Sequence, residues 1–192
     1  MEECTVESAA SGEKTTEEAK GGDEGKKMKV MVAVDESEGS MHALCWALDH
    51  LFTSTGGEVP DKTQALGRLI LLHAQLPPYH LVHPVPVGPA VYATSSAMES
   101  VRKAREENSI CILERASKIC MERLIKAETV IIDGDPKDVI CGATEEMNID
   151  LLIMGSRGLG KIKRAILGSV SDHCAHHAKC PILIVKPPKV QP

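Results

Sequence analysis

Short, continuous runs of apolar residues alternate along the chain with longer segments whose apolar residues recur every three or four positions. The runs occupy residues 29–35, 68–75, 128–133, 150–154 and 181–185. Continuous apolar character over roughly four to eight residues is typical of strands that are buried on both faces of a sheet. The pattern therefore predicts five strands separated by four helices, in the order βαβαβαβαβ.

The four segments between the predicted strands have the period of amphipathic helices. The second is long and follows a Pro-rich connection over residues 76–95. The third has Asp135 as its expected N-cap and Pro136 in its first turn, and the fourth has Ser169 as its expected N-cap. The apolar stripes that we expect to face the sheet include Met41, Leu44, Leu48, Ile112, Ala116, Ile119, Cys120, Val139, Ile140, Ala143, Met147, Val170 and Cys174, and His177 falls on the same face of the fourth helix.

Buried strands that alternate with helices indicate an α/β fold, in which right-handed crossovers cover both faces of a parallel sheet. Ligands of such sheets bind beyond the carboxyl ends of the strands, where the strand order reverses. Asp35, Ala74 and Gly155 stand at predicted carboxyl ends. These three positions are therefore the first candidates for a binding site.

The length and charge of the chain predict one folded domain with an acidic tail. A chain of 192 residues suits a single domain. Residues 1–27 contain eight Asp or Glu, four Lys and almost no large apolar side chains, so they account for −4 of the formal net charge of −5. Such a segment cannot bury enough surface to offset its ordering entropy. We expect a disordered tail over 1–27, a domain over 28–188 and a short tail over 189–192.

Composition argues against several other classes of protein. The domain is close to neutral and aromatic residues make up 2% of the chain, so neither a basic surface nor base-stacking platforms for nucleic acid are expected. The sequence shows no signal-peptide pattern and no apolar run long enough for a membrane helix. We expect a soluble cytoplasmic protein. The seven cysteines form no CxxC pair, and we expect reduced thiols, several of them in the core.

The glycine-rich stretch MGSRGLGKIKRAILGS, residues 154–169, follows the fourth predicted strand and precedes a helix. Glycines at such a turn, together with a helix N-terminus, form a site for phosphate, although a plain tight turn is the alternative. A P-loop would need a hydroxyl after Lys161, where Ile162 stands. A dinucleotide fingerprint would need its third glycine at Lys163. Neither of these two motifs is complete.

The glycine spacing instead resembles the nucleotide-binding signature of the universal stress protein family. Gly155, Gly158, Gly168 and Ser169 follow its pattern G-2X-G-9X-G-S. The segments VAVDESEGSMHALCWAL (32–48), LILLHA (69–74) and HHAKCPILIVK (176–186) support the resemblance, which is strongest to plant members. It implies a Rossmann-like three-layer α/β/α fold with a five-stranded parallel sheet in the order 3-2-1-4-5.

The resemblance also implies ATP, or AMP or ADP, as ligand, with Mg²⁺ bound through the phosphates. It places adenine near Ala33 and Ala74, ribose near Asp35 and Gly155, and phosphates on the amides around Gly158 and Gly168–Ser171. Side chains at Gly158 or Gly168 would then occupy phosphate space. The residues expected to bind the nucleotide are Ala33, Val34, Asp35, Ala74, Met154, Gly155, Arg157, Gly158, Gly168, Ser169, Val170 and Ser171.

Other polar residues leave alternatives open. Asp35 can cap the first helix or contact ribose or metal, and Arg157, Lys161, Lys163 and Arg164 can reach phosphate or remain solvated. His173 and His177 are four residues apart, but no Glu completes a zinc protease motif, and we expect no metal site there.

A regulatory ATP-binding protein in stress adaptation without catalytic residues is the leading hypothesis. A slow ATP hydrolase or phosphotransferase and a chaperone-like partner-binding module are the alternatives. In both alternatives the nucleotide binds in the same cleft. The apolar segment 181–186 should be a sheet edge, and through it we expect a homodimer, as in the family.

Overall fold

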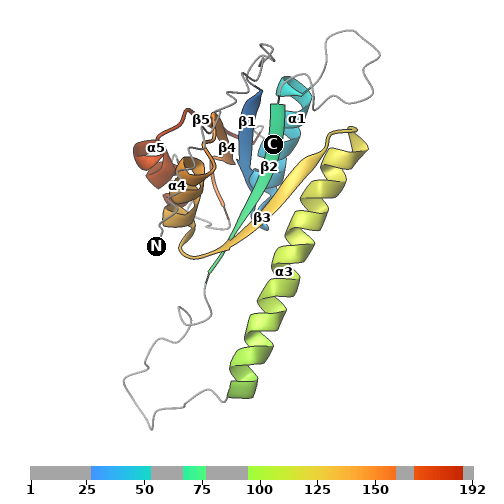
Figure 1. Cartoon of the computed structure of the whole chain (residues 1–192), viewed down its shortest axis with the longest axis vertical. Coiled ribbons are helices and arrows are strands. Elements are labelled where there is room, and N and C mark those ends of the chain that lie inside the picture. Colours follow the sequence, from blue (N-terminus) through green and yellow to red (C-terminus); the bar gives the residue numbers. More distant parts are fainter. Residues whose placement is uncertain (1–26, 53–66, 77–94, 159–166, 188–192) are drawn as a thin grey trace, which may run out of the picture.

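The structure, a computed structural model, describes residues 27–52, 67–76, 95–158 and 167–187 (Figure 1). The acidic tail up to residue 26, the connection over 77–94 and the tail from 188 onward lie outside the described residues. So do Lys161, Lys163 and Arg164. The expectations for these segments stay predictions.

Five parallel strands form one sheet in the order β3-β2-β1-β4-β5, which confirms the predicted fold (Figure 1). Each predicted strand agrees with its observed bounds to within two residues at either end. Met31 at the centre of the sheet pairs with Ile70 on one side and Leu152 on the other, so the strand order reverses between β1 and β4. The strands are β1 (Met28–Ala33), β2 (Gly67–Gln75), β3 (Ala127–Asp133), β4 (Leu151–Gly155) and β5 (Ile182–Val185).

The helices begin where the sequence supplies caps. Ser37 caps the first helix, because its side chain accepts a hydrogen bond from the Ser40 amide. Asp135 caps the helix that starts at Pro136, as predicted. The helices are α1 (Glu38–Leu51), α3 (Ser95–Glu122), α4 (Pro136–Glu146) and α5 (Ser169–His177).

Alternate residues of the strands supply two separate cores on the two faces of the sheet. Val30, Val32 and Leu71 pack in the cluster that includes α1 and α3. Met31 and Leu72 point the opposite way, into the cluster that includes α4 and α5. Both clusters contain fully buried side chains, as continuous apolar strands require. The domain thus has the predicted three layers.

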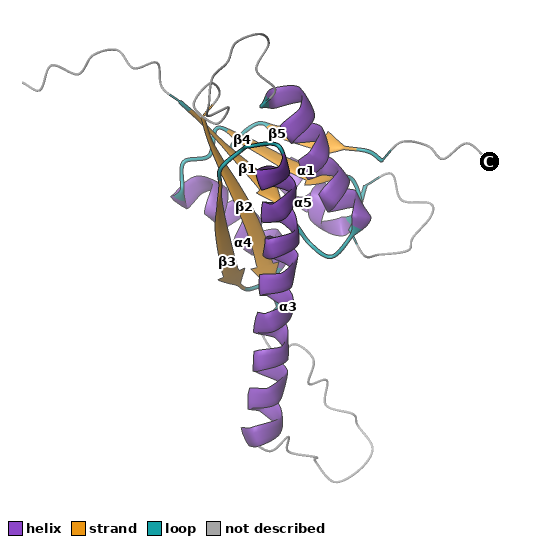
Figure 2. Cartoon of the chain, turned by 90° about the vertical axis from the view of Figure 1, so that its right-hand side faces the viewer, coloured by secondary structure: helices purple, strands orange, loops and turns teal. Residues whose placement is uncertain are grey.

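Helix α3 is longer than the sheet beside which it packs. Its first turns extend past the lower ends of β2 and β3 (Figures 1 and 2). Ile112, Leu113, Ala116 and Cys120 of its second half contribute to the core. Among the described helices none is both long and apolar enough to cross a membrane.

Candidate functional site

A cleft lies at the carboxyl ends of β1, β2 and β4, where the strand order reverses. Its volume of about 380 Å³ falls within the usual range for small-molecule sites, roughly 300–1,000 Å³. All twelve residues predicted to bind nucleotide line this one cleft. Five further lining residues escaped the sequence interpretation: Ser40, Leu72, Pro136, Ile140 and Leu167.

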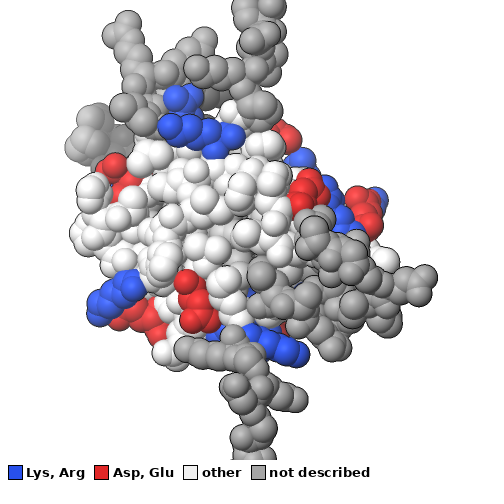
Figure 3. Space-filling model, turned by 90° about the horizontal axis from the view of Figure 1, so that it is seen from above, with Lys and Arg blue, Asp and Glu red and all other residues white. Residues whose placement is uncertain are grey.

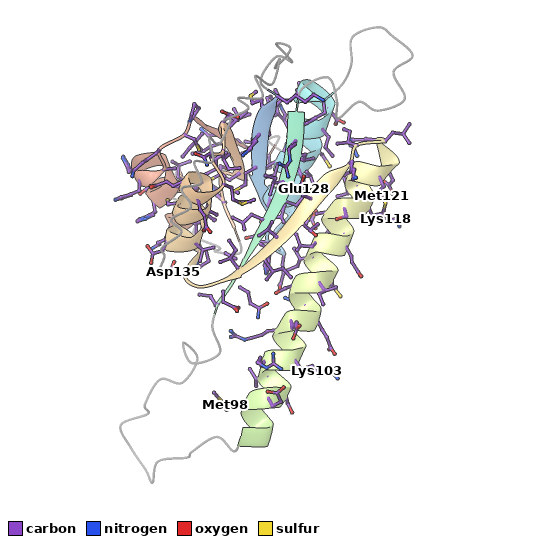
Figure 4. All side chains as sticks on the ribbon, viewed as in Figure 1. Met98, Lys103, Lys118, Met121, Glu128 and Asp135 are labelled. Carbon is purple, nitrogen blue, oxygen red and sulfur yellow. The ribbon has the colours of Figure 1, made fainter. Side chains whose placement is uncertain are left out.

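One wall of the cleft is apolar. Leu72 of β2 and Met154 of β4 are buried and pack in the same core cluster as Ile140 of α4, and these three side chains line the cleft together with Pro136. Asp135, the cap of α4, is labelled in Figure 4 at the lower end of the sheet. The N-cap at Asp135 thus fixes where α4 begins and places its first turns beside the strand ends.

The end of β1 is fastened by hydrogen bonds of short polar side chains. The Asp35 carboxylate accepts from the Ser37 amide, with 3.0 Å between Oδ1 and N, and also from the Ser37 hydroxyl. Ser40 Oγ accepts from the Asp35 amide and donates to the Asp35 carbonyl, at 3.1 and 3.0 Å. Asp35 therefore supports the N-cap residue Ser37 and is not itself the cap of α1.

The side chain of His73, on β2, forms a hydrogen bond with the backbone of Val34 at the end of β1. Its ring is 9% exposed, and Nδ1 lies 2.9 Å from the carbonyl oxygen of Val34, a cleft residue. The Val34 amide donates to the Leu72 carbonyl at 2.9 Å. Both backbone polar groups of Val34 are thus hydrogen-bonded within the protein itself.

The opposite wall is built by the end of β4 and the start of α5. The Gly168 amide donates to the Ser156 carbonyl at 2.8 Å, and Ser171 Oγ donates to the same carbonyl at 3.1 Å. The hydroxyl of Ser171 is therefore engaged in holding α5 against the strand end. Its backbone amide lies in the first turn of α5, where amides have no partner within the helix, and it points toward the N-terminal end of the helix at the cleft.

The predicted N-cap at Ser169 is wrong by one residue. Gly168 is the N-cap of α5, with extended backbone and no side chain to satisfy the first amides. Ser169 is the first helical residue, and it is exposed. A glycine in this position leaves the amides of the first turn available for an anion, and the helix dipole adds a partial positive charge.

The glycines of the stretch have structural reasons that the sequence interpretation missed. A Cβ at Gly158 would lie 2.8 Å from Asp35 Oδ2, and one at Gly168 would lie 3.3 Å from Cα of Arg157. A Cβ at Gly155 would lie 2.7 Å from the backbone of Gly39 at the start of α1. Gly155 and Gly158 thus let the end of β4 approach the segment that follows β1, and Gly168 lets the start of α5 approach the end of β4.

Two charged side chains from opposite walls line the cleft near these glycines. Asp35 is half-buried, whereas Arg157 is exposed. An arginine at the rim can pair with a phosphate, and a carboxylate oxygen is a hard ligand suited to Mg²⁺. Among the described residues, the cleft therefore presents an apolar wall, an array of amides and one charged side chain of each sign.

The histidines of α5 do not face this cleft. His173 and His177 stack on each other with ring centroids 4.0 Å apart, and His177 Nδ1 lies 2.8 Å from the His173 carbonyl oxygen. His177 is exposed, although we expected it on the inward face. Within the described part of the chain, no three His, Cys, Asp or Glu side chains are grouped to hold a metal ion.

Surface charge gives no sign of a polyanion site on the face seen in Figure 3. There, Lys and Arg of the described residues lie at the rim, with Asp and Glu nearby, around a largely uncharged centre. A nucleic-acid site would need a continuous basic stripe.

The fold and the cleft together define a Rossmann-like α/β protein with an open helix N-terminus at the reversal of strand order. Residues 27–186 match the universal stress protein family, and the chain belongs to that family. It is 30% identical over 167 residues to a universal stress protein A-like protein of Arabidopsis thaliana, which covers 82% of this chain and 89% of the relative.

Solved structures agree with this assignment. A universal stress protein family protein from Arabidopsis thaliana, crystallised with AMP bound, has 26% identity and a TM-score of 0.55, over 84% of this chain and 93% of that chain. A universal stress protein in complex with cAMP has 22% identity and a TM-score of 0.55, over 83% of this chain and 97% of that chain. The second likeness shows the shared fold.

Proposed function

We propose that this protein binds ATP in the cleft and acts in the cytoplasm as a nucleotide-dependent regulatory protein of the stress response. The observation that carries the proposal is the meeting, in one cleft, of an apolar wall and the uncapped first turn of α5. The apolar wall suits a nucleotide base, and the free amides of the helix N-terminus suit phosphates. The Arabidopsis thaliana relative with AMP bound supports an adenine nucleotide.

The position of each group follows from the two walls. Adenine lies against the apolar wall formed by Leu72, Met154 and Ile140, next to the backbone of Val34, whose amide and carbonyl are both hydrogen-bonded. Ribose lies near Asp35 and Gly155. The phosphates accept hydrogen bonds from the amides around Gly158 and Gly168–Ser171, and Mg²⁺ binds through the phosphates with Asp35 as the nearest carboxylate.

Binding, and not turnover, is the proposed role of this cleft. Phosphoryl transfer needs a positioned base for the attacking group and cations around the γ-phosphate. Among the described lining residues, Asp35 is the one carboxylate, and its Oδ1 is engaged by Ser37. We therefore assign no catalytic residue.

The test combines a native ligand analysis with a titration. Mass spectrometry of the nucleotide released on denaturation identifies what the purified protein carries. Nucleotide-free protein is then melted in increasing MgATP, because a ligand that binds only the native state raises the melting temperature. No shift at millimolar ATP would overturn the proposal. Steady release of phosphate by the pure protein, lost in a cleft variant, would replace regulation by hydrolysis.

A homodimer through β5 is the second part of the proposal. Strand β5 is at an edge of the sheet, which leaves one side of its backbone to pair with a second copy. Val185 is 6% exposed and packs in the core, so it is unsuitable for mutation. Leu183 is partly buried at the margin of that core. Light scattering should show more monomer for a folded Leu183→Lys variant than for wild type, and an unchanged dimer would exclude this edge.

A further inference from the structure

Two cysteine thiols lie next to each other between α4 and α5, on the face of the sheet that carries the cleft wall. The Sγ atoms of Cys141 and Cys174 are 3.9 Å apart, although the residues are 33 positions apart in sequence. A disulfide bond is about 2.05 Å long, so the two sulfurs need to approach by roughly 2 Å. Side-chain rotation and a small shift of either helix are movements of that size.

The two thiols differ in how open they are to solution. Cys174 is fully buried, whereas Cys141 is half-buried. Burial raises the pKa of the Cys174 thiol to about 12, and the neighbouring Cys141 adds to the shift. Cys174 therefore stays protonated at neutral pH, because the thiolate is the less stable form in apolar surroundings. An oxidant reaches Cys141 first.

The position of the pair connects it to the cleft. Cys141 directly follows Ile140, and Cys174 lies three residues after Ser171, on the same side of α5. Ile140 and Ser171 both line the cleft. A bond between the sulfurs would therefore join the two helices about one turn away from the ligand.

We propose that Cys141 and Cys174 are a modification site, at which peroxide produces an intramolecular disulfide that joins α4 to α5 beside the cleft. The Cys141 thiolate attacks hydrogen peroxide, the O–O bond breaks, and the released hydroxide takes a proton to become water. The resulting sulfenic acid is attacked by the Cys174 sulfur, which loses its proton as hydroxide leaves and becomes the second water. Two thiols are oxidised by two electrons, and one peroxide is reduced to two waters.

Peptide mapping of the full chain tests the site. Reduced protein is treated with hydrogen peroxide at pH 8, quenched in acid, alkylated in denaturant and digested without reduction. We expect a linked pair of peptides that contain Cys141 and Cys174, two hydrogens lighter than the separate peptides. The oxidised protein should melt about 5–10 °C higher, because the bond restricts the unfolded chain.

Variants make the result decisive. Cys141→Ser should abolish the link and leave Cys174 free for alkylation. Cys111→Ser, at an exposed position on α3, should have no effect. Cys180 also lies in this core cluster, so Cys180→Ala tests whether it replaces either partner, and we expect the 141–174 link to persist. A link to Cys180, a sulfinic acid at Cys141, or full alkylation of both thiols after peroxide would overturn the proposal.

The expected effect of the disulfide on ATP affinity rests on the proposed function, and it is measured in a separate experiment. Approach of the sulfurs narrows the space between Ile140 and Ser171, so oxidised protein should bind ATP at least about threefold more weakly than reduced protein. Equal affinities would remove the connection to the cleft and leave the disulfide. ATP that binds neither form would contradict the proposed function and not the disulfide.

Discussion

Helices α1 and α5 both begin at the cleft, but their first turns satisfy their amides in different ways. At α1, the Ser37 hydroxyl accepts from the Ser40 amide at 3.2 Å, and Asp35 in turn accepts from Ser37. At α5, the cap is Gly168, which makes no side-chain hydrogen bond. The first helix therefore has a cap of its own, whereas the amides of the second are open to a ligand.

Because of this difference, the start of α1 should contribute mainly to folding stability and the start of α5 mainly to ligand binding. A capped helix end contributes to folding whether or not a ligand is present. An uncapped end leaves amides that gain a partner when an anion arrives, and the dipole adds to the attraction. Substitutions at α1 should therefore change mainly the free energy of unfolding, and substitutions at α5 mainly the affinity for ATP.

The largest effect is expected for Gly168→Val. A Cβ at this position lies 3.3 Å from Cα of Arg157 and 3.6 Å from the Gly158 amide nitrogen, so valine should push α5 away from the glycine stretch. We expect ATP affinity to fall more than about a hundredfold, which corresponds to roughly 2.8 kcal/mol. Calorimetry measures the affinity. Circular dichroism and a melt establish that the variant folds, and a folded variant with wild-type affinity would mean that the glycines merely shape a turn.

Ser169→Ala should have a smaller effect of the same kind. Ser169 is exposed at the first position of α5, so alanine removes one hydroxyl and leaves every backbone amide. Loss of a hydrogen bond to a charged group costs about 1.5–3 kcal/mol, or about ten- to a hundredfold in affinity. The melting temperature without ligand should stay within error of wild type. Unchanged ATP affinity in the same titration would exclude the hydroxyl from the site.

Ser37→Ala should have the opposite effect: it should lower the stability of the fold and leave ATP affinity almost unchanged. The variant loses the cap of α1, so the free energy of unfolding should fall by about 1 kcal/mol. The Ser37 amide still donates to Asp35 at 3.0 Å, so ATP affinity should change less than about threefold. Urea denaturation and calorimetry on the same preparations measure both quantities. A large loss of affinity without a loss of stability would invalidate the distinction between the two helix ends.

Gly142→Ala is the matched control and should have the smallest effect. Gly142 lies inside α4, is exposed, and a Cβ there would meet no heavy atom of the described residues within 4 Å. Alanine should stabilise the protein by up to about 1 kcal/mol through helix propensity, with ATP affinity unchanged. If this variant lost affinity as Gly168→Val does, the loss at Gly168 would not be specific to the helix end.

The sequence predicted the fold well because the strands are buried on both faces. Apolar runs such as residues 68–75 fit only a sheet that is covered on both faces. The order of the strands in the sheet came from the resemblance to the universal stress protein family. The residues predicted to bind a nucleotide line one cleft for the same reason, since strand ends and glycines mark one edge of the sheet. Pro136 and Ile140 were missed because their approach depends on how the α4 crossover packs, which no local pattern records.

The errors in the site have local physical causes. Serine is a common N-cap, so Ser169 was preferred to Gly168, although the chain turns into the helix one residue earlier. The proximity of Gly158 to the Asp35 carboxylate arises between segments far apart in sequence. The contact between Cys141 and Cys174 is of the same kind, because a separation of 33 residues gives no periodic signal.

The overhang of α3 has a consequence for hydrogen exchange. Arg102 pairs with Glu99 at 2.6 Å and with Glu106 at 3.6 Å, and all three side chains are more than half exposed. Lys103, labelled with Met98 in Figure 4, lies on the same part of the helix. Such pairs are weak and are screened by salt.

The two halves of α3 should therefore open independently. Amides around residues 99–107 should exchange deuterium through local fraying, and faster as ionic strength rises. Amides around Ile112, Leu113 and Ala116, which are buried in the core, should exchange only when the domain unfolds. One continuous helix should thus contain a segment that frays and a segment of the folding core. The two meet near Ser109, which is 1% exposed and whose hydroxyl donates to the Gln75 side chain at 2.6 Å.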